Sequence, residues 1–187
     1  MSRTFQTDPD RIRAVRRSAG RMPRIRARTA RPGRAHPASP ADIMRLLCDL
    51  GEFFHYGIEA IDLMPGHTER ARLRLGALKV PGRIVLYDQP LSPWLVPGQL
   101  NACDERRIRR HGALVEPVLG GIRVEWPEDA LRDFMLFDVL LHEIGHHVLQ
   151  HYTGKRTVRA ARTRDHEAFA IRFAACRQKR RAPTESA

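Results

Sequence analysis

The longest hydrophobic pattern in the chain predicts a buried helix over residues 127–152. Pro127 and the acids that follow it open this segment, and Gly154 lies just beyond its end; such residues are typical of helix termini. The apolar residues between them fall on several sides of a helix: Leu131, Phe134, Met135, Phe137, Val139, Leu140, Leu141, Ile144, Val148 and Leu149. A helix of this kind packs inside a domain rather than on its surface.

Shorter patterns predict further helices and several strands. Ser39-Pro40, a capping residue followed by proline, starts a helical repeat of apolar residues that ends near Tyr56-Gly57. We expect the polar residues 98–112 to form an exposed helix or excursion, and a last helix to cover 163–178. Apolar alternation between turn residues predicts the strands, which lie at 58–64, 71–75, 83–87, 113–118 and 121–126, the last two as a hairpin.

These elements predict a single domain of the α+β class over residues 39–178. We expect a small, mainly antiparallel sheet packed beside the helix pair 127–152 and 163–178. The strand at 121–126 directly precedes the first of these helices, so it would suit the edge of a cleft. An extended peptide could add to such an edge as one more strand.

Charge separates the ends of the chain from this domain. The 187 residues carry a net charge of +12, and residues 1–40 account for +9 of it through eleven arginines and two aspartates. A segment with few large apolar residues and high charge does not fold by itself. We therefore predict a disordered arginine-rich arm at 1–38 and a disordered tail at 179–187. The arm either contacts nucleic acid weakly and salt-dependently or only aids solubility, and both interpretations stay open.

Cysteine content and hydropathy indicate a compartment. The three cysteines, Cys48, Cys103 and Cys176, are odd in number and far apart, which is typical of a reducing environment rather than of a disulfide framework. No apolar run reaches the roughly 18 residues that a membrane-spanning helix needs, and no apolar signal segment opens the chain. We therefore expect a cytoplasmic protein without membrane contact.

Ionisable residues interrupt the buried helix where the sequence reads His142-Glu143-Ile144-Gly145-His146. Positions i and i+4 of a helix lie about 40° apart around its axis, so both imidazoles project from one face. They can share a metal ion, and the carboxylate of Glu143 then lies beside the water that the metal holds. The pattern predicts a zinc-dependent hydrolase, most simply a peptidase. The competing interpretation is a core helix with neutral, hydrogen-bonded histidines.

A catalytic zinc ion usually has three protein ligands. The pattern that places a third histidine on the same helix, H-E-x-x-H-x-x-G-x-x-H, fails because Leu149 and Tyr152 occupy its last two positions. A glutamate on the following helix is the other arrangement, and Glu167 lies 21 residues after His146. We predict Glu167 as the third ligand, with Asp165 and His166 as alternatives. The competing interpretation is that Asp165 and Glu167 bind no metal and only complement the dipole at the start of their helix.

Four neighbouring residues are candidates for supporting roles. His151, Tyr152 or His166 could stabilise a reaction oxyanion. Asp138, one turn before His142, either accepts the second imidazole proton of that histidine or is a solvated acid. His147 and His151 are also four residues apart, but they project well away from the motif face, so we interpret them as surface or packing residues.

The two blocks His142–His146 and Asp165–Ile171 together resemble the gluzincin-type zinc metallopeptidases, above all the ImmA/IrrE family, whose pattern is HELGH followed by a helix of the form E-x-E-A-x-x-F-A. The resemblance covers residues 121–176. It implies a zincin-like fold, His142, His146 and Glu167 as zinc ligands, and Glu143 as general base. It also implies a bacterial or phage intracellular protease that often acts on a DNA-binding repressor. Asp165 and Ile171 depart from the family pattern, which usually has Glu and Phe there.

A second resemblance, to SprT-like proteases that act on protein bound to DNA, would suit the basic arm, although their C-terminal cysteine zinc ribbon is absent from this sequence. We therefore expect a metallopeptidase with one Zn²⁺ per chain that hydrolyses peptide bonds of an intracellular protein. The alternative is a non-catalytic, metal-stabilised binding module that contacts DNA or a DNA-binding protein through its basic arm. A metal-free structural protein is the third hypothesis.

Overall fold

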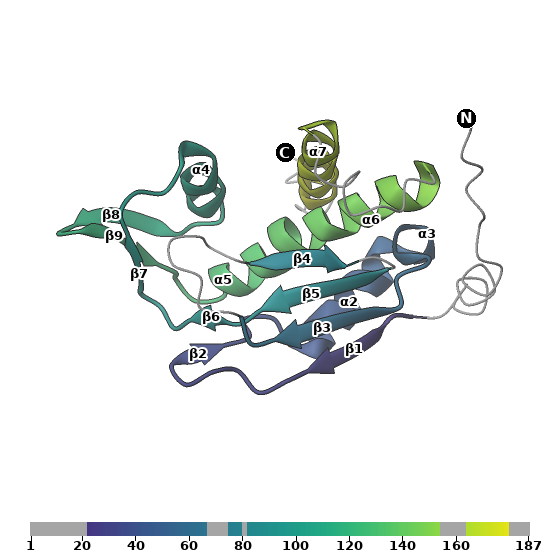
Figure 1. The fold of residues 1–187 in the computed structure, drawn as a ribbon, viewed down its shortest axis with the longest axis horizontal. Coiled ribbons are helices and arrows are strands. Elements are labelled where there is room, and N and C mark those ends of the chain that lie inside the picture. Colours follow the sequence, from purple (N-terminus) through teal and green to yellow (C-terminus); the bar gives the residue numbers. More distant parts are fainter. Residues whose placement is uncertain (1–21, 67–74, 80–81, 154–163, 180–187) are drawn as a thin grey trace, which may run out of the picture.

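The computed structural model of the chain describes residues 22–66, 75–79, 82–153 and 164–179. Its largest sheet has four strands in the order β1-β3-β5-β4 (Figure 1). The strands are β1 (Arg24–Ala27), β3 (Ala60–Met64), β5 (Arg83–Tyr87) and β4 (Gly76–Lys79). β1, β3 and β5 run parallel, and β4 is antiparallel to β5. The α+β class is confirmed, but the prediction of a mainly antiparallel sheet is wrong for this sheet.

The parallel pairing follows from the order of elements along the chain. Parallel neighbours need a crossover connection, and helices α2 (Pro40–Leu50) and α3 (Glu52–His55) provide one between β1 and β3. After β3 the chain first forms the edge strand β4 and then turns back into β5. The predicted strands at 58–64 and 83–87 are thus present as β3 and β5. The predicted strand at 71–75 lies outside the described residues except for Leu75, which precedes β4.

Helices α2 and α3 replace the single helix predicted from Ser39 to Tyr56. Ser39 caps α2 as predicted: its hydroxyl accepts from the backbone N–H of Asp42, whose carboxylate accepts from the backbone N–H of Ser39. The helix ends at Gly51, which has φ +87°, a left-handed conformation that glycine adopts without strain. The chain then starts α3 in a new direction.

Residues 22–38 belong to the fold, so the predicted boundary of the disordered arm at residue 38 is wrong for this part. β1 pairs with β3, and β2 (Arg34–Ala35) pairs antiparallel with β6 (Gln89–Pro90). Ile25 packs against the hydrophobic core, while Arg24 and Arg26 are exposed. One large apolar residue among arginines suffices for an edge strand, and such a sparse pattern does not separate a strand from a disordered arm. Residues 1–21 of the predicted arm, and 180–187 of the predicted tail, lie outside the described residues.

A second sheet is formed by β7 (Trp94–Pro97), β9 (Gly121–Glu125) and β8 (Leu114–Val118), all antiparallel, in the order β7-β9-β8. β8 and β9 are the predicted hairpin. β9 lies in the centre of this sheet, so the expectation that it forms a cleft edge is wrong. The polar segment 98–112 contains helix α4 (Ala102–Arg110), whose Ile108 is buried.

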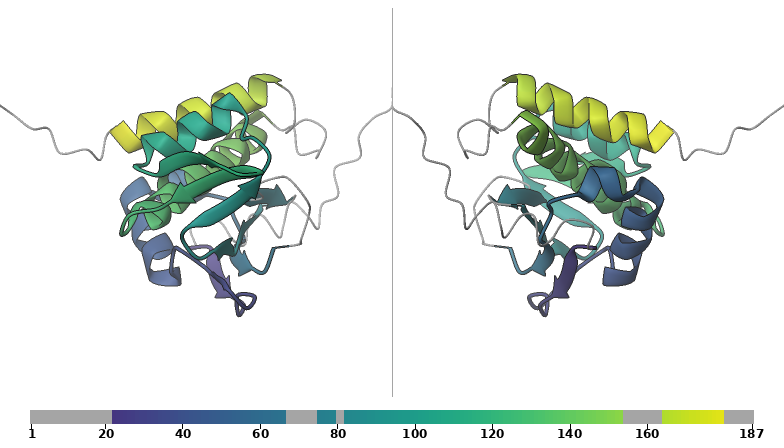
Figure 2. Two further views of the ribbon diagram at one scale, coloured as in Figure 1. Left: turned by 90° about the vertical axis from the view of Figure 1, so that its left-hand side faces the viewer. Right: turned by 90° about the vertical axis from the view of Figure 1, so that its right-hand side faces the viewer.

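The predicted buried helix consists of three successive elements: α5 (Ala130–Asp133), a π-helical segment η1 (Phe134–Leu140) and α6 (Leu141–Thr153). The last helix, α7 (Arg164–Lys179), packs on α6. α2, η1 and α6 contact β1, β5 and β4 respectively and so cover one face of the large sheet. Figures 1 and 2 show α4 and α7 on the opposite side of α6 from that sheet.

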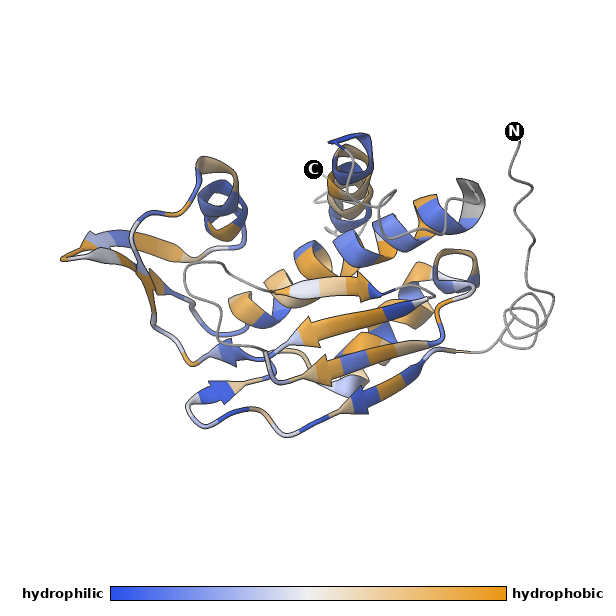
Figure 3. Cartoon of the chain, viewed as in Figure 1, coloured by the Kyte–Doolittle hydropathy of each residue, from blue (hydrophilic) through white to orange (hydrophobic). Residues whose placement is uncertain are grey.

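The core lies between these layers and is assembled from elements distant in sequence. Ile43 of α2, Ile61 of β3, Ile84 of β5 and Ile144 of α6 are completely buried. Figure 3 shows hydrophobic residues concentrated in β3 and β5, with polar residues prominent on β1. Within the described ranges, every helix is too short or too polar to cross a bilayer.

Candidate metal centre

Helix α6 places two imidazoles of the motif next to each other. The Nε2 atoms of His142 and His146 are 3.0 Å apart, and the two rings are nearly perpendicular, at 88°. His146 is buried and His142 is partly buried. Both nitrogens therefore face one point beside the helix, as the i, i+4 spacing predicts.

Helix α7 brings Glu167 to the same point. Its Oε2 lies 3.3 Å from Nε2 of His142, and its Oε1 lies 3.4 Å from Nε2 of His146. These histidines act as hydrogen-bond donors and hold the pKa of Glu167 well below its usual range. The carboxylate is therefore kept in the ionised form that metal ligands require.

Gly145 allows α7 to approach α6 this closely. A Cβ atom at this position would lie 3.0 Å from Cα of Ala170 and 3.2 Å from Cβ of Phe173. Both neighbours belong to α7, and one of them is a backbone atom, which cannot move without moving the helix. The glycine inside the motif thus sets the distance between the helices that carry the three candidate ligands.

The donor set and its spacing fit a zinc ion. Two imidazole nitrogens and one carboxylate are a known ligand set of catalytic zinc sites, which keep the fourth position for water. Donors about 2.1 Å from a tetrahedral ion lie about 3.4 Å from one another. The observed separations are 3.0, 3.3 and 3.4 Å. In the described part of the chain, these three residues form the group of His, Cys, Asp or Glu side chains close enough to hold an ion.

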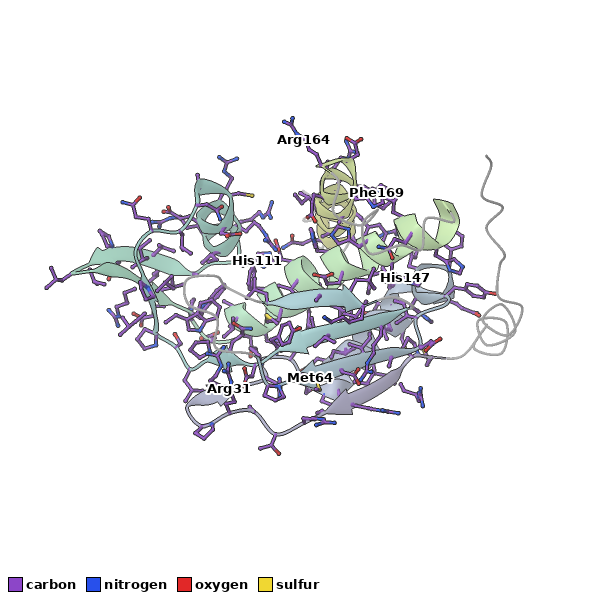
Figure 4. The ribbon with its side chains drawn as sticks, in the orientation of Figure 1. Arg31, Met64, His111, His147, Arg164 and Phe169 are labelled. Carbon is purple, nitrogen blue, oxygen red and sulfur yellow. The ribbon has the colours of Figure 1, made fainter. Side chains whose placement is uncertain are left out.

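Among the alternative ligands and oxyanion donors, Asp165, His166 and His151 lie outside the three-residue group. Asp165 is exposed and His166 is buried, and neither belongs to the three-residue group. His151 stacks on His147 and contacts the Tyr56 ring edge-on. Nε2 of His147, a residue labelled in Figure 4, lies 2.8 Å from the backbone carbonyl oxygen of Tyr56. This contact packs α6 against the end of α3. Tyr152 is in α6, and its side chain lies outside the described residues.

Glu143 lies between α6 and the edge of the large sheet. Burial raises the pKa of Glu143 above its ordinary value, against the opposing charges of His142 and His146 and a hydrogen bond from the backbone of Leu78 in β4. A carboxylate with a raised pKa, adjacent to a metal site, has the properties of a general base. β4 is an edge strand of the sheet that the structure describes, and its contact with Glu143 places this edge beside the candidate metal centre.

Asp138 does not have either of the roles predicted for it. It is buried, and its Oδ1 accepts from Nε of Arg107 at 2.8 Å, while its Oδ2 accepts from Nη2 of Arg110 at 3.1 Å. Nε2 of His111 lies 3.5 Å from the same carboxylate. Burial alone would raise the pKa of Asp138, but the contacts with His111 and Arg107 lower it well below its usual range. The acid thus ties α4 to η1 rather than orienting His142.

The four arginines among residues 106–110 are the one sequence feature that indicates this network, and they do not identify Asp138 as the partner. Together, the site combines three donors suited to a metal with a carboxylate suited to proton transfer.

Comparisons with protein-family models, with curated proteins and with solved structures found no match to this chain.

Proposed function

We propose that the chain is a zinc-dependent metallopeptidase with a zincin-like fold. His142, His146 and Glu167 would hold one zinc ion, and Glu143 would be the general base. The observation that carries the proposal is the convergence of three donors, 3.0–3.4 Å apart, from two helices, with a partly buried carboxylate next to them. The resemblance of the two motif blocks to the ImmA/IrrE family supports the same conclusion.

Each residue has a defined part in peptide hydrolysis. When bound, zinc supplies a Lewis acid that polarises the scissile carbonyl and lowers the pKa of water. Glu143 takes a proton from the attacking water and later delivers it to the leaving amine. The backbone of Leu78 holds the carboxylate of Glu143 in place. Burial of this carboxylate strengthens it as a base, because desolvation disfavours its charged form.

The proposed substrate is an extended segment of an intracellular protein. β4 lies at the edge of the described sheet, next to Glu143, and an extended peptide can bind such an edge by strand addition. The resemblance favours a DNA-binding repressor as the natural substrate. Cys48, Cys103 and Cys176 are all unpaired and exposed, which supports a reducing compartment such as the cytoplasm.

The test compares two variants that separate metal binding from turnover. Glu143→Gln should keep one zinc per chain and lose hydrolysis of a labelled, unfolded protein by about 10²- to 10⁴-fold, the usual contribution of a general base. His146→Ala should lose both zinc and hydrolysis. Zinc is measured by elemental analysis after dialysis, and turnover by release of labelled peptides.

Unchanged hydrolysis by Glu143→Gln, or a wild-type protein that binds no zinc, would contradict the proposal. Stoichiometric zinc in a wild-type protein that cleaves neither unfolded protein nor a peptide library would favour the non-catalytic binding module instead. Loss of DNA binding on removal of residues 1–21 would then show whether the basic arm is its contact surface.

A further inference from the structure

A small basic cavity adjoins the candidate metal centre. It has a volume of about 150 Å³ and lies between α4, η1, α6 and α7. Its lining residues are Cys103, Arg106, Arg107, Arg110, Asp138, His142, Ile171, Ala174, Ala175 and Gln178. A cavity of this size accommodates a group about as large as benzene, which corresponds to one side chain. Because His142 forms part of its wall, a group bound there would lie beside the candidate metal centre.

The charges around the cavity are unbalanced. Three guanidinium groups, those of Arg106, Arg107 and Arg110, face a single carboxylate among the lining residues, that of Asp138. Asp104 contacts Arg107 from outside the lining, at 3.4 Å. No carboxylate of the described residues pairs with Arg106, which is exposed. The cavity therefore keeps an excess of positive charge beside the motif helix.

Arg106 and Arg110 have N–H donors that no carboxylate of the described residues fully uses, whereas Arg107 is held in place by Asp138. Arg107 binds Asp138 through both Nε and Nη2, and its side chain is only 24% exposed. Arg110 gives one N–H to Asp138, at 3.1 Å, and its side chain is 47% exposed. A guanidinium has five N–H donors, so Arg110 retains several that Asp138 does not use. Asp138 thus positions Arg110 and leaves it able to bind a further anion.

We propose that this cavity is a specificity pocket that binds a carboxylate of the substrate next to the scissile bond, through Arg106 and Arg110. Arginine pairs with carboxylates in a planar, two-point geometry that makes such recognition selective. The apolar wall from Ile171, Ala174 and Ala175 suits the methylene groups of an aspartate or glutamate side chain. This inference rests on the proposed peptidase function, whose substrate class it defines.

The test uses matched peptides with the zinc-loaded protein. One set carries Asp or Glu next to the cleavage site with an amidated C-terminus, a second has Asn or Gln there, and a third is neutral with a free C-terminal carboxylate. We expect kcat/KM to be about 10- to 100-fold higher for the acidic set than for the amide set. If only the third set is preferred, the pocket binds the chain terminus and the side-chain proposal is wrong.

Variants of α4 connect the preference to the pocket. Arg106→Gln with Arg110→Gln should reduce the acidic preference to about twofold or less, and Arg106→Glu alone, at an exposed position, should shift it toward basic peptides. Arg109→Gln is the matched control, because Arg109 binds Glu105 and the carbonyl of Val115 outside the cavity; it should keep the full preference. Equal preference ratios in all variants would overturn the proposal.

Binding to Glu143→Gln separates this inference from the proposed function. The acidic peptides should bind this variant about tenfold more tightly than the amide peptides in fluorescence anisotropy, and the difference should shrink with added salt. Acidic selectivity that depends on Arg106 and Arg110, combined with a zinc-loaded wild-type protein that hydrolyses none of the peptides, would support the pocket and contradict the peptidase. Hydrolysis by the wild-type protein without a preference for acidic peptides would support the peptidase and contradict the pocket.

Discussion

Glu167 is the residue that joins the two helices of the candidate metal centre. We predict that Glu167→Ala lowers zinc affinity by more than about 100-fold, because loss of a ligand costs more than the 10- to 100-fold typical of outer-shell partners. Affinity is measured by competition with a chromophoric chelator. Asp165→Asn is the matched control, since Asp165 is an exposed acid in the same turn of α7 and outside the three-residue group. Equal zinc affinity in both variants would exclude Glu167 as a ligand.

The residues of the site differ in how far sequence alone could identify them. His142 and His146 were predictable because helix geometry fixes their relation within five residues. Glu167 required the further assumption that α7 packs on α6 with its Glu167 face toward the two histidines. This packing depends on the contact between Gly145 and Ala170. Asp138 could not be assigned, because its partners Arg107 and Arg110 are 31 and 28 residues away on another helix.

At the scale of elements, the distance between α6 and α7 depends on Gly145. Alanine is favoured over glycine in a helix by about 1 kcal/mol, but overpacking against a backbone atom costs about 1–3 kcal/mol. We predict that Gly145→Ala lowers the free energy of unfolding by about 1 kcal/mol, and weakens zinc binding because Glu167 moves with α7. Urea unfolding and chelator competition measure the two effects.

A larger residue provides the graded control for this contact. Gly145→Val should destabilise the protein further and weaken zinc binding more than alanine does, since its side chain must displace both Ala170 and Phe173. If Gly145→Ala instead raises stability with zinc affinity unchanged, the two helices separate at little cost, and Gly145 does not set the geometry of the centre.

The elements that sequence reasoning predicted well are those with strong local signals. The hairpin β8–β9 and the capped start of α2 at Ser39 follow from turn and capping residues. The parallel pairing of β1 with β3 depends on long-range contacts, and the single Ile25 of β1 gives too weak a pattern to reveal them. The break at Gly51 was visible as a glycine, but continued apolar spacing as far as Phe54 masked it.

At the scale of the whole molecule, Asp88 fastens the segment of residues 22–38 to the large sheet. This completely buried carboxylate follows β5. It accepts hydrogen bonds from Nη2 of Arg31 at 3.0 Å, Nε of Arg34 at 2.9 Å and the backbone N–H of Gly66 at 2.9 Å. Three segments far apart in the sequence thus meet at one acid. Burial alone would raise the pKa of Asp88, but these contacts, those with Arg31 foremost, lower it well below its usual range.

A carboxylate whose pKa is lower in the folded than in the unfolded state stabilises the fold above its unfolded pKa of about 4, and this contribution is lost as pH falls through the folded pKa. We predict that Asp88→Asn lowers the free energy of unfolding by about 2–3 kcal/mol at pH 7, somewhat less than for a fully buried pair because both arginines reach solvent. The difference from wild type should narrow progressively below pH 4, because the unfolded wild-type chain then binds a proton at Asp88 that the folded chain does not bind. Urea unfolding of both proteins at pH 7 and pH 3 tests this, since all other carboxylates titrate equally in the two. A difference that stays constant between these pH values would show that Asp88 holds the N-terminal segment by shape and neutral hydrogen bonds, and not through its charge.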